Sequence, residues 1–203
     1  MKILIACEES QEVCKAFRAL GHEAYSCDII PCSGGHPEWH IQDDVLNHLN
    51  DGWDMMIAHP PCTYLSRAGT RWLFAGHILN QERYKKGLES KEFFLKLLNA
   101  NIFMIAVENP VPHKVFNMPH ETQTIQPYEF GHPYSKKTCL WLKNLPKLIG
   151  SQYMKPQYYY DKKGLRHSAF TANWDAKKKS KTFPGIAKAM AEQWGSISKE
   201  VTS

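Results

Sequence analysis

The fold predicted for this chain depends on one stretch, Trp53-Asp54-Met55-Met56-Ile57-Ala58-His59-Pro60-Pro61-Cys62-Thr63-Tyr64-Leu65-Ser66. Its short apolar run ends at two prolines, which is typical of a central strand of a parallel sheet, covered on both faces. Functional sites in open α/β sheets lie at the carboxyl ends of such strands. The prolines stiffen the backbone before Cys62, so its thiol is a candidate reactive group. A small buried thiol in an ordinary turn is the alternative interpretation.

The N-terminal part has the pattern of a βαβ unit. A β-rich run at 2–7 precedes a helical pattern at 11–20, and a second strand at 23–27 delivers Asp28. Asp28 stands about twenty positions after the first turn, where an acidic residue commonly binds a nucleoside ribose. We expect Ser10 to cap the helix and Gly21 to stop it. The apolar face of this helix comprises Val13, Ala16, Phe17 and Leu20.

The first turn of this unit, Ala6-Cys7-Glu8-Glu9-Ser10, contains no glycine. Without glycines the backbone cannot wrap closely around a diphosphate, and two carboxylates would repel one. This turn therefore disfavours a dinucleotide, and it suits better a nucleoside that carries a positive centre and no phosphate, as S-adenosylmethionine does.

The loop after Asp28 contains Cys32, His36 and His40, and together with Cys27 they are residue types that bind zinc. Their spacings match none of the usual paired-knuckle patterns, so we predict no metal and a polar loop over a cleft. A third strand at 41–45 would place Asp43 and Asp44 beside Asp28.

A second polar strand end follows further along the chain. The segment 67–78 contains two glycines and is predicted as a mobile loop, whereas 84–99 has the strongest helical pattern, with a core stripe. The strand predicted at 102–107 ends in Glu108-Asn109-Pro110. Rigidly held Cys and Glu side chains at neighbouring strand ends suit a thiolate nucleophile and a proton-handling carboxyl. Taken by itself, Glu108 is equally a solvated strand terminus or a helix cap. The stripe comprises Tyr84, Leu88, Phe94, Leu95 and Leu98.

Charge is distributed unevenly along the chain, whose net charge is +5. From Tyr134 onward there are 14 Lys or Arg and 4 Asp or Glu, so this part carries +10 and the preceding part −5. Two further strands are predicted at 122–127 and 138–142, and a helix at 184–198. The segment 143–181 between them interleaves tyrosines with lysines, which suits base stacking and phosphate contact. Nucleic acid is therefore the predicted partner, with solvated loop lysines as the alternative.

Composition bounds the remaining possibilities. The 203 residues are 43% hydrophobic and 22% charged, which predicts one globular domain over 1–203. No apolar run spans a bilayer and no signal-peptide pattern opens the chain, so we expect a cytoplasmic protein that does not enter a membrane. Six scattered cysteines predict reduced thiols.

The order of these turns resembles that of the S-adenosylmethionine-dependent cytosine C5 DNA methyltransferases, and more closely that of a compact phage-associated set of them. Pro60-Pro61-Cys62 with Ser66 resembles the Pro-Cys nucleophile motif, and Val107-Glu108-Asn109 resembles the Glu-Asn motif. The segment 130–142 is similar to the later Gln-x-Arg-x-Arg motif. In that motif Tyr134, Lys136 and Thr138 replace the Gln and both Arg.

The resemblance implies an α/β fold with a Rossmann-like class I methyltransferase sheet, helices on both faces, and mostly parallel strands with antiparallel edge strands. It implies methyl transfer from S-adenosylmethionine to carbon 5 of cytosine in DNA, with catalysis by Cys62, Glu108 and Lys136. The cofactor would be bound by Cys7, Glu8, Asp28, Ile29, Asp44 and Pro60. Contacts to the base or to DNA would come from Pro61, Ser66, Arg67, Arg71, Asn109 and Thr138.

Departures from the family pattern keep two alternatives open. The first loop lacks the family's Phe-x-Gly-x-Gly, and roughly forty residues stand where a target-recognition domain is expected. Single DNA-binding modules bury about 600–1,000 Å², so an insert of this length would read only a few bases. One alternative is a related enzyme that modifies carbon 5 of a free pyrimidine nucleotide. The other is a non-catalytic DNA-binding protein on a methyltransferase scaffold.

Overall fold

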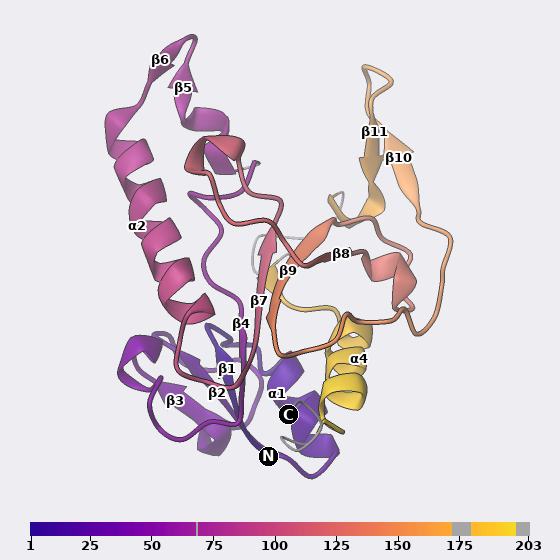
Figure 1. Ribbon diagram of the computed structural model, residues 1–203. Helices are drawn as coiled ribbons and strands as arrows, with labels where there is room; N and C mark the ends of the chain where they lie inside the picture. Colours follow the sequence, from indigo (N-terminus) through magenta and orange to yellow (C-terminus); the bar gives the residue numbers. More distant parts are fainter. Residues whose placement is uncertain (68, 172–179, 198–203) are drawn as a thin grey trace.

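The run Met55–Ala58 forms β4, the middle strand of a seven-stranded sheet with the order β3-β2-β1-β4-β7-β9-β8 (Figure 1). The computed structural model describes residues 1–67, 69–171 and 180–197. All four residues of β4 are buried, as expected for a central strand covered on both faces. The other strands of this sheet are β1 (Lys2–Ala6), β2 (Glu23–Asp28), β3 (His40–Gln42), β7 (Met104–Pro110), β8 (Gln123–Ile125) and β9 (Thr138–Lys143).

Most of the strands run in one direction. β1 pairs in parallel with β2 and β4, β2 with β3, and β4 with β7. β9 runs antiparallel to both of its neighbours, β7 and β8. The α/β fold with a mostly parallel, Rossmann-like sheet and antiparallel pairing towards one edge is therefore confirmed.

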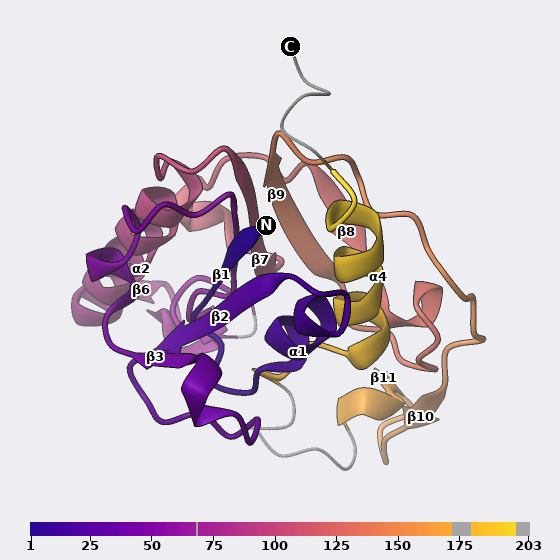
Figure 2. The same ribbon diagram turned by 90° about the horizontal axis from the view of Figure 1, so that it is seen from below.

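Helices cover both faces of the sheet, because successive side chains of each buried strand point to opposite faces. Ile3 and Ile5 of β1 pack with α1 (Glu12–Ala19) and α4 (Pro184–Trp194). Leu4 and Ala6 pack on the other face, where α2 (Gln81–Leu98) lies. Figure 2 shows α1 and α4 side by side on one side of the sheet and α2 on the other.

The start of α1 differs from the prediction. Ser10 does not cap the helix; Gln11 precedes it in a left-handed conformation, with a φ of 58° and no side-chain cap bond. The carboxylate of Glu8 accepts hydrogen bonds from the backbone N–H groups of Val13, at 2.7 Å, and Cys14, at 3.2 Å. A buried carboxylate thus satisfies N–H groups that the helix leaves open. Gly21, at a φ of +82°, follows the end of the helix as predicted.

Two strand ends and two side chains of predicted helix faces also differ from the prediction. β3 ends at Gln42, three residues before the predicted Val45, because Asp44 caps the short helix that follows. β7 continues through Glu108 to Pro110, since these residues pair with β9 beyond the point where β4 ends. Two side chains assigned to helix faces are exposed instead, Leu20 of the first helix and Leu88 of α2.

Two small hairpins were not predicted. β5 (Phe74–Ala75) pairs with β6 (Ile78–Leu79) inside the segment expected to be a loop, and β10 (Tyr158–Tyr160) pairs with β11 (Arg166–Ser168) inside the Tyr- and Lys-rich segment. Both hairpins extend beyond the carboxyl ends of the parallel strands, on opposite sides of the molecule (Figure 1). The 3-10 helices are η1 (Pro37–Trp39), η2 (Val45–Asn47), η3 (Gly69–Trp72), η4 (Lys114–Phe116), η5 (Pro127–Glu129) and η6 (Ala169–Thr171).

Candidate active site

The turn after β4 holds Cys62 in a fixed place. The backbone N–H groups of Leu65 and Ser66 both donate to the carbonyl of Cys62, at 3.2 and 2.9 Å. On the preceding side, the amide Nδ2 of Asn109 donates to the carbonyl of Pro60 at 3.0 Å. The chain therefore leaves β4, turns through the two prolines, and is fastened to β7 just before the half-buried thiol.

Glu108 lies on β7, one residue past the last pair between β7 and β4, Ala58 with Val107. Its Oε2 is 3.3 Å from Nδ1 of His59, and the two side chains are 19% and 10% exposed. Burial alone would raise the pKa of Glu108, but the His59 hydrogen bond and the charges of Lys136 and His59 outweigh it and lower that pKa. Glu108 is consequently an ionised carboxylate at neutral pH.

The thiol of Cys62 has the opposite tendency. Burial and the negative charge of Glu108 raise the pKa of Cys62, and the lowering effects of Lys136 and of a hydrogen bond from Ser66 do not compensate. Lys136 therefore lowers the pKa of Cys62, but its effect is smaller than that of burial and Glu108. In the absence of a ligand, Cys62 carries its proton.

Lys136 and Thr138 lie on the other side of Glu108. With Glu108 they line a cavity of about 20 Å³, which Ser180–Phe183 and α4 close from above. The Nζ of Lys136 is 5.4 Å from the ring centroid of Phe170 and 6.0 Å from that of Phe183. A cavity of this size holds about one water molecule and is much smaller than a pyrimidine ring.

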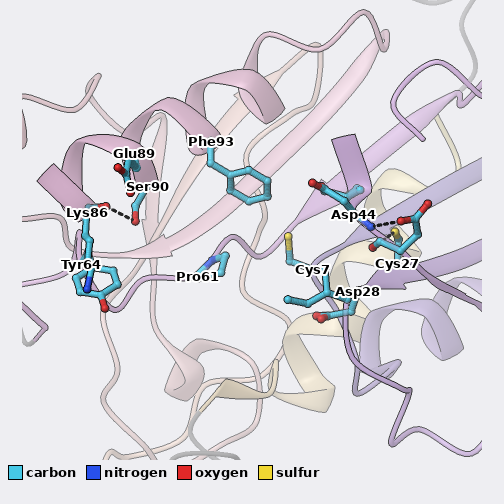
Figure 3. Close-up of a pocket in the computed structure, with 13 residues that line it drawn as sticks. Cys7, Cys27, Asp28, Asp44, Pro61, Tyr64, Lys86, Glu89, Ser90 and Phe93 are labelled. Carbon is cyan, nitrogen blue, oxygen red and sulfur yellow. Dashed lines mark hydrogen bonds between the residues drawn. The ribbon is translucent and has the colours of Figure 1, made fainter. Parts of the chain in front are cut away.

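A larger pocket of about 430 Å³ opens next to this turn. Figure 3 shows Cys7, Cys27, Asp28 and Asp44 on one side of it, and Tyr64, Lys86, Glu89 and Ser90 on the other, with Pro61 and Phe93 between them. The size falls in the range of small-molecule sites, which is about 300–1,000 Å³. Three aspartates at strand ends give one wall a negative charge, namely Asp28, Asp43 and Asp44.

A second cavity, of about 370 Å³, shares Cys7 and Asp28 with this pocket. Glu9 and Lys181 bring both signs of charge to its walls, whereas burial raises the pKa of Glu8, which lines the cavity together with His59. It also shares Ser180, Lys181 and Thr182 with the small cavity beside Glu108. The three cavities therefore form a row along the carboxyl ends of the strands, from the aspartates to Glu108.

Several residues predicted for the site have a structural role in the described part of the chain. Glu8 binds the first turn of α1, although it also lines the second cavity. Pro60 is buried and is held by Asn109, which is itself buried. Ser66 is buried, accepts a hydrogen bond from the backbone N–H of Gly69 at 3.1 Å, and contacts Cys62.

The remaining predicted residues lie apart from the row of cavities or at its edge. Arg67 is exposed, and its backbone N–H donates to the carbonyl of Val111 at 3.1 Å. Arg71 belongs to η3, and its side chain lies outside the described part of the structure. Ile29, although exposed, lines the large pocket next to Asp28. The lysines 177–179 also fall outside the described residues.

Sequence patterns missed two groups of residues. His59 precedes the prolines, and nothing in its local sequence indicates that it meets a residue 49 positions away. Tyr64, Lys86, Ser90 and Phe93 line the large pocket, although α2 was interpreted as a core helix. Phe94, the next residue of α2, is buried against the sheet. The rotation of α2 about its axis therefore determines that Phe93 lines the pocket.

Residues 1–67, 69–171 and 180–197 contain neither a metal-binding cluster of side chains nor a helix that could span a membrane. No group of three or more His, Cys, Asp or Glu side chains is arranged to hold a metal ion there. No helix in these ranges is long and apolar enough to cross a membrane.

No protein-family model matches the chain, and no curated protein matches its sequence. Among solved structures, the chain is similar to a crystal structure described as a candidate DNA modification methyltransferase encoded within a prophage (E. coli), with 12% identity and a TM-score of 0.44. The similarity covers 75% of this chain and 51% of that one, so this chain spans about half of the length of that protein.

Proposed function

We propose that this protein transfers a methyl group from S-adenosylmethionine to carbon 5 of cytosine in DNA. The observation that carries the proposal is that a fixed thiol, Cys62, lies near an ionised, half-buried carboxylate, Glu108, at the end of a row of cavities of which the two larger ones have the size of small-molecule sites. Carbon 5 of a pyrimidine is a weak nucleophile until a group adds at carbon 6, and a thiol next to a proton-handling carboxyl suits that addition.

The lining of the cavities suits S-adenosylmethionine. Asp28 and Asp44 offer acceptors for ribose hydroxyls and adenine at the 430 Å³ pocket, where a phosphate would be repelled. The adjoining cavity has Glu9 for an ammonium group and Lys181 for a carboxylate, which are the two charges of an amino acid. When bound, this cofactor supplies an electrophilic methyl group.

The protein's own residues then act on the pyrimidine ring. Cys62 attacks carbon 6, Glu108 handles the proton at the ring nitrogen N3, and the nearby Lys136 stabilises negative charge between them. Carbon 5 thereby gains the electron density to accept a methyl group, and loss of its proton then releases Cys62. Because Cys62 and Glu108 are held at one site, attack at carbon 6 and proton transfer at N3 can occur together on one bound ring.

DNA as the carrier of the ring is supported by the surface next to the site. The β10–β11 hairpin exposes Tyr158, Tyr159 and Tyr160 together with Lys162, Lys163 and Arg166. Exposed aromatic and basic side chains of this kind bind bases by stacking and phosphates by charge. Extrusion of a base from duplex DNA costs a few kcal/mol, which such contacts would offset.

The test measures transfer of tritiated methyl groups to three acceptors: duplex DNA, single-stranded DNA and free dCMP. We expect label in DNA, and almost none with Cys62→Ala, because that variant has no group to add at carbon 6. Cys32→Ala, a change at a half-buried thiol distant from Glu108 in the sequence and absent from the three cavities, serves as the matched control and should retain activity.

Other outcomes separate the alternatives. Label in dCMP but not in DNA would indicate an enzyme that modifies a free nucleotide. Label that persists in Cys62→Ala would exclude the covalent route. DNA binding without calorimetric binding of S-adenosylmethionine would indicate a non-catalytic DNA-binding protein.

A further inference from the structure

His59 joins the end of β4 to the candidate catalytic carboxylate. Its backbone N–H donates to the carbonyl of Ala6 at 2.9 Å, which fixes it at the strand end. Its ring Nδ1 lies 3.3 Å from Oε2 of Glu108, and the ring is only 10% exposed. Its Nε2 is buried and has no hydrogen-bond partner among the described residues. Among the described residues, the imidazole of His59 therefore makes its hydrogen bond to Glu108, and this contact orients the carboxylate.

The surroundings of Glu108 explain what this contact does. A carboxylate at such a depth would normally keep its proton, because burial penalises the charged form. The hydrogen bond from His59 and the charges of His59 and Lys136 oppose that penalty and lower the pKa of Glu108. The other titratable groups near this pair are Cys62 from the turn, Cys139 of β9, Lys181 from the segment before α4, Asp28 at the end of β2, and Cys7, Glu8 and Glu9 from the β1–α1 loop.

An ionised Glu108 has a specific use beside a protonated thiol. Burial and the charge of Glu108 raise the pKa of Cys62, so the thiol must lose its proton as it attacks. The carboxylate that raises this pKa is also a base able to take the proton. A protonated Glu108 would be unable to accept it.

We propose that His59 is a positioning residue that keeps Glu108 oriented and ionised, so that Glu108 takes the proton of Cys62 and delivers it to the ring nitrogen N3. This inference rests on the proposed function. As the Sγ–C6 bond forms, the S–H bond breaks, the electrons of C5=C6 and C4=N3 move to C4=C5 and N3, and N3 gains the proton. On release, carbon 5 loses its own proton to solvent, the Sγ–C6 bond breaks, and the N3 proton returns through Glu108 to Cys62.

The experiment follows methyl transfer against pH for wild type, His59→Ala and His59→Asn. Activity requires ionised Glu108, so it falls as pH decreases through the pKa of that carboxyl. In His59→Ala this acid limb should move up by about one pH unit, which lowers kcat/KM roughly tenfold at pH values below the limb. Asn offers an N–H near the position of Nδ1, so His59→Asn should lie between the two. His36→Ala, which removes a surface histidine bonded to Glu38 at 3.0 Å, should keep the wild-type profile.

A second measurement makes the inference independent of activity. Carbon NMR of the Glu108 carboxyl, identified by its disappearance in Glu108→Gln, gives the pKa of Glu108 directly. This pKa should rise in His59→Ala. An unchanged pKa of Glu108, or a loss of activity that is uniform across pH, would overturn the role of His59. Absence of methyl transfer in the wild-type protein would instead contradict the proposed function. The NMR titration would still show whether His59 lowers the pKa of Glu108.

Discussion

Asn109 illustrates how one side chain can connect two strand ends. It was expected to contact the substrate, yet its amide is buried and donates to the carbonyl of Pro60 at 3.0 Å. This bond ties the turn that carries Cys62 to the strand that carries Glu108. The mutual position of thiol and carboxylate therefore depends on a residue that need not touch a ligand.

The variant Asn109→Ala tests this role. It leaves the buried Pro60 carbonyl without its donor, which we expect to lower the free energy of unfolding by about 1–2 kcal/mol, measured by urea denaturation. Asn50→Ala, which changes an exposed amide, should alter stability by less than about 0.5 kcal/mol. If Asn109→Ala lost affinity for a nucleic acid and kept full stability, the bracing role would be wrong.

At the scale of elements, the two hairpins differ in the chemistry that they expose. β5–β6 and its approach present Trp72, Phe74 and Ile78, whereas β10–β11 presents tyrosines and cations. Both project past the carboxyl ends of the strands (Figure 1). The basic hairpin is the element that we expect to contact phosphates.

The double variant Lys162→Ala/Lys163→Ala tests the basic hairpin. It removes two exposed cations from the hairpin turn, so DNA affinity should fall and the slope of log K against log salt should become shallower by about 1–2. The control Lys15→Ala/Lys188→Ala removes two cations from α1 and α4. Fluorescence anisotropy across a salt series measures both; equal effects of the two double variants would contradict the assignment.

For the whole molecule, the row of cavities predicts a preference among nucleotides. S-adenosylmethionine at about 100 times its dissociation constant should stabilise the protein by about 2.7 kcal/mol, which corresponds to a rise in Tm of about 5–10 °C. NAD should give no rise, because Asp28, Asp43 and Asp44 repel its phosphates. Scanning calorimetry measures the difference.

Charge-matched variants at the two ends of β2 serve as controls for this shift. Asp28→Asn, at the pocket, should reduce the rise in Tm, whereas Glu23→Gln, at the opposite end of the same strand, should leave it intact. A larger rise with NAD than with S-adenosylmethionine would contradict the proposed cofactor.

Local sequence patterns were sufficient to predict the sheet and which polar residues follow its strands. The apolar run Met55–Ala58, the βαβ pattern around Asp28 and the helical pattern that begins at residue 184 predicted elements that the structure contains, because burial of one face of an element imposes a period on its sequence. The order of strand ends also brought Cys62 and Glu108 to one edge. These are local patterns, and they can be read from neighbouring residues.

Tertiary structure decided the contacts between residues distant in sequence. His59 meets Glu108 and Asn109 meets Pro60 across 49 positions each, Glu8 caps α1 in place of Ser10, and Phe93 turns into a pocket. Each depends on how far β7 extends past β4 and on how helices are rotated on the sheet, which no local period encodes. The protonation states of Cys62 and Glu108 follow from those contacts, because burial and neighbouring charges set a pKa and both are properties of the folded chain.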